Sequence, residues 1–219
     1  EVSADQKTWT VRLRPGIHFA ADPAFDGQPR ELVAEDYVYS IKRFADPAVN
    51  SPGWKDVEAL GLVGLKAYRA QLLQSKARFD YARPIAGLQV LDRHTLRFQL
   101  ERPNPRFLFA LASGDIFGAV AREVVEAHAD DTMAHPVGTG PFVLKTWRRS
   151  SEIVLERNPA YRERRYEDEA EPAANDAEGQ ALFARYRGRR LPIVDRVVVA
   201  IVEENQPRWL SFLNAQIDA

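Results

Sequence analysis

The chain has 219 residues, 45% of them hydrophobic, which is enough apolar material for one domain or two small ones. Its 30 basic and 31 acidic residues leave a net charge of −1, so it lacks the electrostatic signature of a protein that binds nucleic acid or an anionic membrane. It has no cysteine, which excludes disulfides and thiolate metal sites, and no apolar run approaches the roughly 18 residues of a membrane span.

The first hundred residues predict a sheet and two helical regions. Residues 8–13 alternate apolar and polar side chains, as a half-buried strand does, and residues 17–20 follow as a short second strand. Residues 34–45 have helical apolar spacing, and so does a second region, 57–79, which two glycines interrupt. Residues 88–100 alternate around an Asp-Arg turn and predict a hairpin. We expect the first strand and the hairpin to share one antiparallel sheet with a packed face formed by Trp9, Val11, Leu96 and Phe98.

The next part of the chain contains short helices and a second hairpin. Asn104 is a good N-cap for a helix over 106–112, with proline at its first position. Residues 112–120 are irregular, and 121–129 form a short helix. Residues 142–157 predict a hairpin.

The last part combines a charged segment with apolar elements. Residues 162–190 are dense in charge and predict a solvated insertion, with a helix near 179–187. The β-branched run 193–202 indicates a strand buried on both faces, and a helix follows over 207–217. We expect exposed apolar surface near this strand and helix, because the sequence reads as a piece of a longer protein, with no initiator methionine or signal peptide at its start.

The stretch VGTGPF, 137–142, looks at first like a phosphate-binding loop. A Walker A loop needs a lysine and a hydroxyl after its last glycine, whereas here Pro141 follows and removes a backbone N–H. The dinucleotide fingerprint also fails, because no strand precedes Gly138 and a strand follows Gly140. We interpret the stretch as a tight turn that leads into a sheet.

The sequence contains no motif for metal binding or for catalysis. Of the four histidines only His128 and His135 are close, and their spacing matches no metal site. There is no nucleophile elbow, and adjacent carboxylates such as Glu35 and Asp36 point in different directions. We therefore predict neither catalysis, metal nor cofactor.

Four motifs together resemble one family. The segments TWTVRLRPGIHFA with FDGQPRELVAEDYVYSIKRFADP, LDRHTLRFQLERPNPRFL, VGTGPFVLKTW with IVLERNPAYR, and VDRVVVAIVEENQPRWLSFLNAQIDA resemble, in order and spacing, bacterial extracellular solute-binding proteins of family 5. That family serves ABC importers of peptides, nickel and related solutes. Three features depart from its pattern: Val33 where a capping threonine is common, Gln216 where glycine is usual, and the long insertion 162–190.

The resemblance implies an incomplete α/β (α+β) fold of the periplasmic binding protein-like II type. Residues 1–118 would be the family's extra β-rich domain, and 119–219 part of the first ligand-binding lobe. The implied function is non-enzymatic capture of a solute, with a peptide as the leading candidate, and its delivery in the periplasm to an ABC permease, which is the only link to the membrane. The signal peptide would lie outside this sequence. Alternatives are a ligand-sensing domain of a transcriptional regulator and a binding protein for nickel or another small solute.

The resemblance also places three segments at the ligand: Gly53 and Trp54; Ser113, Gly114, Asp115, Ile116 and Phe117; and Glu204 with Asn205. An exposed Trp54 ring would offer a flat apolar face, and Asp115 and Glu204 would each pair with a cation such as a peptide amino terminus. The alternative is that Trp54 packs its loop onto its own domain and that both acids are solvated.

Overall fold

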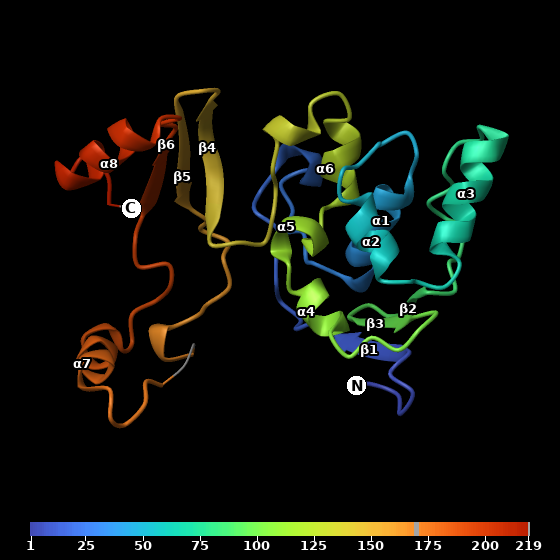
Figure 1. Ribbon diagram of the computed structural model, residues 1–219, viewed down its shortest axis with the longest axis horizontal. Helices are drawn as coiled ribbons and strands as arrows, with labels where there is room; N and C mark the ends of the chain where they lie inside the picture. The colour runs from blue at the N-terminus through green and yellow to red at the C-terminus, as the bar shows by residue number, and fades with distance from the viewer. Residues whose placement is uncertain (169–170, 219) are drawn as a thin grey trace. The chain divides into compact units, whose positions relative to one another are not determined.

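The structure is a computed structural model that describes residues 1–168 and 171–218, apart from the side chain of Asp115. It divides into two compact units, which are described separately (Figure 1). Unit 1 comprises residues 1–17 and 22–129, and unit 2 comprises residues 18–21 and those from 130 onward.

Unit 1 is built on a three-stranded antiparallel sheet in the order β1-β3-β2. The strands are β1 (Thr8–Arg12), β2 (Leu88–Asp92) and β3 (Thr95–Gln99). The register places Trp9 opposite Phe98 and Val11 opposite Leu96, so all four lie on one face, which packs into the core. This confirms the sheet and the packed face that the alternation predicts.

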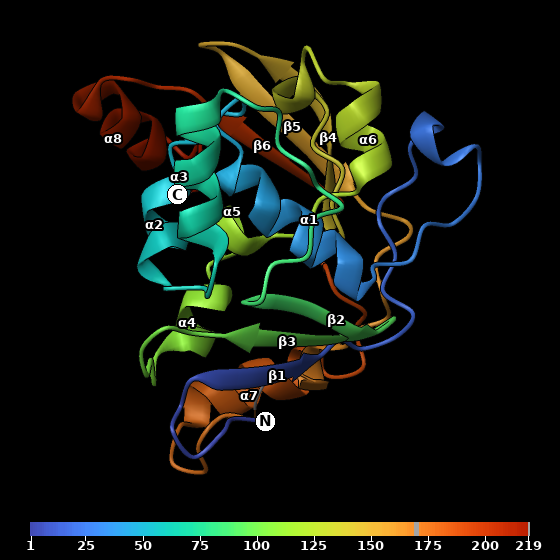
Figure 2. The same cartoon turned by 90° about the vertical axis from the view of Figure 1, so that its right-hand side faces the viewer.

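Helices pack against that face of the sheet (Figure 2). They are α1 (Ala34–Ala45), α2 (Trp54–Ala59), α3 (Leu65–Ser75), α4 (Phe107–Leu111) and α5 (Gly114–Phe117). Unit 1 also contains the 3-10 turn η1 (Pro23–Phe25) and α6 (Arg122–Ala127), which contact each other. The predicted helix over 34–45 is confirmed, and so is the break in the second helical region. Gly61 and Gly64 both have positive φ, which glycine adopts without steric cost, and they separate α2 from α3.

The start of α1 depends on a buried ion pair. Val33 supplies no side-chain cap, as its departure from the family pattern predicts, and its N–H donates instead to Asp36 Oδ2 at 2.8 Å. Arg30 donates to both oxygens of Asp36, at 2.6 and 3.1 Å, and also to Glu123 of α6. Asp36 is only 3% exposed, so this network ties the beginning of α1 to α6 inside unit 1.

Three predictions of local structure need correction. Residues 17–20 form only a bridge at His18, because their backbone groups bond to separate segments: Ile17 O accepts from Leu32 N in unit 1. Asn104 is not an N-cap, since α4 begins at Phe107 and Asn104 Oδ1 accepts from Arg106 N in the preceding turn. The second helical region ends at Ser75, where Lys76 turns the chain with a positive φ.

A carboxylate joins the loop before α1 to the β2–β3 turn. Glu31 accepts hydrogen bonds from Gly16 N at 2.8 Å and from Arg93 at 2.9 Å, and it lies 3.1 Å from His94 Nε2. The Gly16 N–H, then Arg93 and His94, lower the pKa of Glu31 to about 2. The folded state therefore binds fewer protons at Glu31 than the unfolded state does.

We expect this group to make unit 1 sensitive to acid. Its stabilising contribution is complete above the unfolded pKa of roughly 4.3 and is lost as the pH falls through the folded pKa of about 2. The melting temperature of the wild type should therefore fall more steeply between pH 5 and pH 2 than that of Glu31→Gln. Parallel pH profiles for the two proteins would contradict this expectation.

Unit 2 contains a second antiparallel sheet, in the order β4-β5-β6. Its strands are β4 (Phe142–Arg148), β5 (Glu152–Arg157) and β6 (Arg196–Ala200), which confirms the predicted second hairpin. The GTGP turn leads directly into β4, and buried Asn158 holds it: Nδ2 donates to Gly140 O at 2.8 Å, and its N–H donates to Pro141 O at 2.9 Å. The interpretation of this stretch as a turn into a sheet is thus confirmed.

The charged insertion is more structured than predicted. It contains the 3-10 turn η3 (Tyr166–Asp168) and α7 (Ala177–Tyr186), which confirms the expected helix. Phe183 of α7 is buried, and the Tyr166 ring lies against both Phe183 and Tyr186. A small aromatic cluster therefore orders a segment whose charge pattern alone predicts only solvated surface.

The end of the chain exposes apolar side chains. The β-branched run forms only the five residues of β6, which pairs with β5 on one side and is exposed along most of its length, so the prediction of a strand buried on both faces is wrong. The last helix, α8 (Asn205–Leu213), is shorter at its end than predicted, and its Trp209 is 58% exposed. The predicted exposed apolar surface is confirmed by Val198, Val199, Ile201, Trp209, Leu210, Phe212 and Leu213.

Candidate ligand-facing surface

The loop before α2 lies on an aromatic ring of α1. Gly53 is the N-cap residue of α2, and a Cβ added there would come within 2.7 Å of the Phe44 ring, so glycine allows the loop its close approach. Trp54 packs partly against the core, and the guanidinium of Arg69 lies 4.9 Å from its ring centroid. One part of Trp54 thus serves packing, as the alternative interpretation holds, while the residue remains partly exposed.

The second predicted segment forms the short helix α5. Ser113 precedes it, and its carbonyl accepts from the N–H groups of Ile116 and Phe117. Phe117 is buried in the core of unit 1, whereas Ile116 is half-buried and Gly114 faces open space. Asp115 lies in the helix, but its side chain is outside the described part of the structure.

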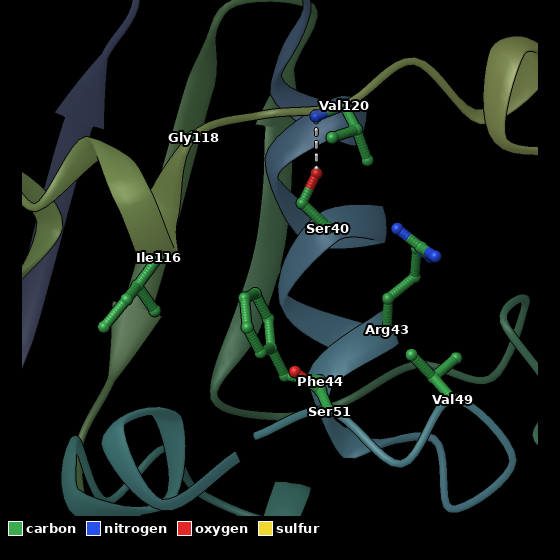
Figure 3. A pocket seen from close by; sticks show the side chains of 8 residues that line it. All are labelled: Ser40, Arg43, Phe44, Val49, Ser51, Ile116, Gly118 and Val120. Carbon is green, nitrogen blue, oxygen red and sulfur yellow. Dashed lines mark hydrogen bonds between the residues drawn. The ribbon is translucent and has the colours of Figure 1, made fainter. Parts of the chain in front are cut away.

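Ile116 of the second segment lines a hollow of about 170 Å³ in unit 1, together with Ser51 of the loop that leads to Gly53 and Trp54 (Figure 3). Its lining comprises Ser40, Arg43, Phe44, Val49, Ser51, Ile116, Gly118 and Val120. The Ser40 hydroxyl accepts from Val120 N at 2.9 Å and donates to Asp36 O at 2.6 Å, so it fixes the 118–120 segment on α1. The structure therefore brings together Ile116 and the loop that carries Gly53 and Trp54.

Sequence reasoning missed the three residues of α1 that line this hollow. Ser40, Arg43 and Phe44 are spaced i, i+3, i+4, which places them on one face of a helix. The apolar spacing that predicts α1 concerns the core-facing residues on the adjoining face, so it gives no sign of this second face. The sequence signal that could have revealed this site is a serine, an arginine and a phenylalanine at helical spacing on a face that the core pattern does not explain.

The third predicted segment belongs to unit 2. Glu204 is the exposed N-cap residue of α8 and makes no side-chain cap, while Asn205 Oδ1 accepts from Arg208. This segment and the hollow therefore belong to different units.

A second hollow in unit 1, of about 250 Å³, is lined by charged and phenolic side chains. Glu35 is exposed and Asp36 is buried in its ion pair with Arg30, so these adjacent carboxylates do diverge. Arg122 lies over the rings of Tyr39 and Tyr81 and pairs with Glu126 at 2.6 Å. Burial and the hydrogen bond to Asp46 raise the pKa of Tyr81, so neither phenol is poised as a base near neutral pH.

Within residues 1–168 and 171–218, no group of three or more histidine, aspartate or glutamate side chains is placed to hold a metal. Over the same ranges, every helix is too short or too polar to cross a bilayer.

A family model described as bacterial extracellular solute-binding proteins, family 5 Middle, matches residues 1–219. The chain belongs to this family. It is 32% identical over 159 residues to the periplasmic oligopeptide-binding protein OppA of Salmonella typhimurium. The aligned region covers 72% of this chain and 26% of the relative. It is 28% identical over 170 residues to di/tripeptide-binding protein 2 of Pseudomonas aeruginosa, and here the aligned region covers 74% of this chain and 28% of the relative.

Solved structures agree with the family assignment. The murein tripeptide-binding protein MppA of Escherichia coli matches with a TM-score of 0.68 and 25% identity, over 98% of this chain and 34% of that one. This confirms the predicted fold, an incomplete mixed helix-and-sheet structure of the periplasmic binding protein type. The chain spans about a quarter of the length of these curated family 5 relatives and about a third of the solved chain.

Proposed function

We propose that the protein containing this chain is the periplasmic solute-binding component of an ABC importer. It captures a peptide without chemical change and delivers it to the permease subunits. The observation that carries this proposal is the family match over residues 1–219, with relatives named as binding proteins for oligopeptides, di- and tripeptides and murein peptides.

In this proposal, residues 1–118 are the extra domain of the family and residues 119–219 are part of its first ligand-binding lobe. The wall of the ligand site in unit 1 is formed by the loop of Gly53 and Trp54 and by the segment from Ser113 to Ile116. Ser51 and Ile116 line the same hollow, and Gly53 lies on the Phe44 ring that also lines it, which supports the grouping of these two segments. Phe117 supports the wall from the core, since its side chain is buried.

Charged residues of each unit are also proposed to contact the ligand. Asp115 and Glu204 are assigned to cationic groups of the ligand, such as a peptide amino terminus, because a carboxylate binds an ammonium group through charge-assisted hydrogen bonds. Asn205 adds a polar contact beside Glu204. Glu204 is exposed and makes no side-chain cap for α8, so its carboxylate is accessible to a ligand.

The test uses the full-length protein and the solute that mass spectrometry identifies in the purified material. Trp54→Ala should weaken calorimetric affinity for that solute about tenfold or more, as truncation of an aromatic contact does. Trp147→Ala, in β4 of unit 2, is the matched control and should leave affinity near that of the wild type. If Trp54→Ala stays folded and binds with unchanged affinity, its loop is not part of the ligand site. Recovery of a solute that is not a peptide would instead overturn the proposed substrate class.

A further inference from the structure

The hollow of Figure 3 contains a cation that has no ion pair within the described residues. Arg43, in the last turn of α1, is half-buried, and its guanidinium makes no hydrogen bond or ion pair with the described part of the chain. The acid nearest in sequence, Asp46, is engaged elsewhere: Tyr81 Oη donates to Oδ2 at 2.9 Å, and Ala48 N donates to Oδ1 at 2.9 Å. A partly desolvated guanidinium gains most from an anion that can accept its paired N–H groups.

The rest of the hollow suits an anion carried on an apolar stem. Figure 3 shows Phe44 between Arg43 and Ile116, and Val49 and Val120 add further apolar surface. None of the lining residues is acidic. The volume of about 170 Å³ compares with the roughly 150 Å³ of an engineered cavity that holds benzene. A short aliphatic chain that ends in a charged group therefore fits.

A second donor lies on the loop side of the hollow. The Ser51 Oγ accepts from Gly53 N at 3.3 Å, and within the described residues its own O–H has no acceptor. The Ser40 hydroxyl, by contrast, already donates to Asp36 O. Arg43 and Ser51 thus offer donors from two different segments, while Ser40 is fixed by the fold.

We propose that this hollow binds a carboxylate on a short apolar stem, with Arg43 and Ser51 as its donors and Phe44 and Ile116 against the stem. This inference rests on the proposed function, so the carboxylate belongs to a bound peptide. It comes either from an acidic side chain or from the carboxyl terminus. Arg43 is then a determinant of specificity for anionic peptides.

The test measures binding of four tripeptides to the full-length protein by calorimetry. They are Ala-Glu-Ala and Ala-Gln-Ala, each with a free and with an amidated carboxyl terminus. The wild type should prefer the carboxylate member of a pair by about tenfold or more, which is the value of a hydrogen bond to a charged group. The pair that shows the preference identifies the source of the carboxylate.

Arg43→Met keeps the apolar stem and removes the charge, so it should abolish that preference while the affinity for the amide member stays unchanged. Arg43→Lys should keep part of the preference, because a lysine retains the charge without the bidentate geometry. Arg97→Met, on the exposed face of β3, is the control and should bind as the wild type does.

A preference that is equal in the wild type and Arg43→Met would overturn the inference and leave the proposed function intact. So would a wild type that binds the tripeptides without distinguishing acid from amide. If the wild type binds none of the four tripeptides and no other peptide, the proposed function fails, and this inference fails with it.

Discussion

Replacing Phe107 by alanine is expected to destabilise unit 1 by about 3–5 kcal/mol, because the change removes a fully buried ring and leaves a cavity. Phe107 is 0% exposed, and its ring centroid lies 5.1 Å from that of Phe98 and 5.7 Å from that of Trp9. These contacts join α4 to both β3 and β1. The opening free energy of the slowest amides of β3, measured by hydrogen exchange, reports this unit without interference from unit 2.

Phe109 provides a matched control on the same helix. It is 78% exposed, so Phe109→Ala should change the opening free energy by no more than about 0.5 kcal/mol. Equal effects of the two substitutions would show that the ring of Phe107 is not part of the core.

Asp36→Ala is expected to cost about 3 kcal/mol, since it removes a buried carboxylate and leaves the partly buried guanidinium of Arg30 without its shorter ion pair. The side chains of Asp36 and Arg30 are only 4% and 23% exposed, and they approach to 2.6 Å. Asp36 and Glu123 raise the pKa of Arg30, so the guanidinium cannot avoid the cost by losing its proton. The substitution also removes the acceptor of the Val33 N–H at the start of α1. Hydrogen exchange of the α1 amides measures the combined effect.

The matched control is Glu123→Gln, which alters the other carboxylate that Arg30 contacts. Its side chain is 44% exposed, so the loss should be at most about 1 kcal/mol. If Asp36→Ala proved as mild as Glu123→Gln, the start of α1 would not depend on the ion pair.

Elements whose apolar face is buried by other elements of the same unit could be predicted from the sequence. Trp9, Val11, Leu96 and Phe98 alternate because one face of their sheet is buried by helices of the same unit, so pattern and burial agree. The prediction for the run at 193–202 is wrong because this strand is not covered in the same way. Its β-branched residues are typical of a strand whose two faces are both buried. In the structure, β6 pairs with β5 along one edge, and most of its side chains are exposed.

The candidate site could be predicted only in part, because its members come from different kinds of signal. Trp54 and Ile116 were found through the family resemblance, and the hollow brings Ile116 close to the loop of Trp54. Arg43 and Phe44 were missed, since they belong to a helix whose apolar spacing is already explained by the core. Only their position relative to α5, which is distant in sequence, shows that they line a hollow together with Ile116.

Helix α1 serves two surfaces at once, and this limits how it can adapt. Val38, Ile41 and Ala45 are buried in the core, while Ser40, Arg43 and Phe44 line the hollow from the adjoining face. A substitution in the core that rotated the helix, or shifted it along its axis, would displace the hollow by a similar amount. Variation is therefore easiest in the loop opposite the helix, for example at the exposed Val49, so related proteins can alter the shape of the hollow there without repacking the core.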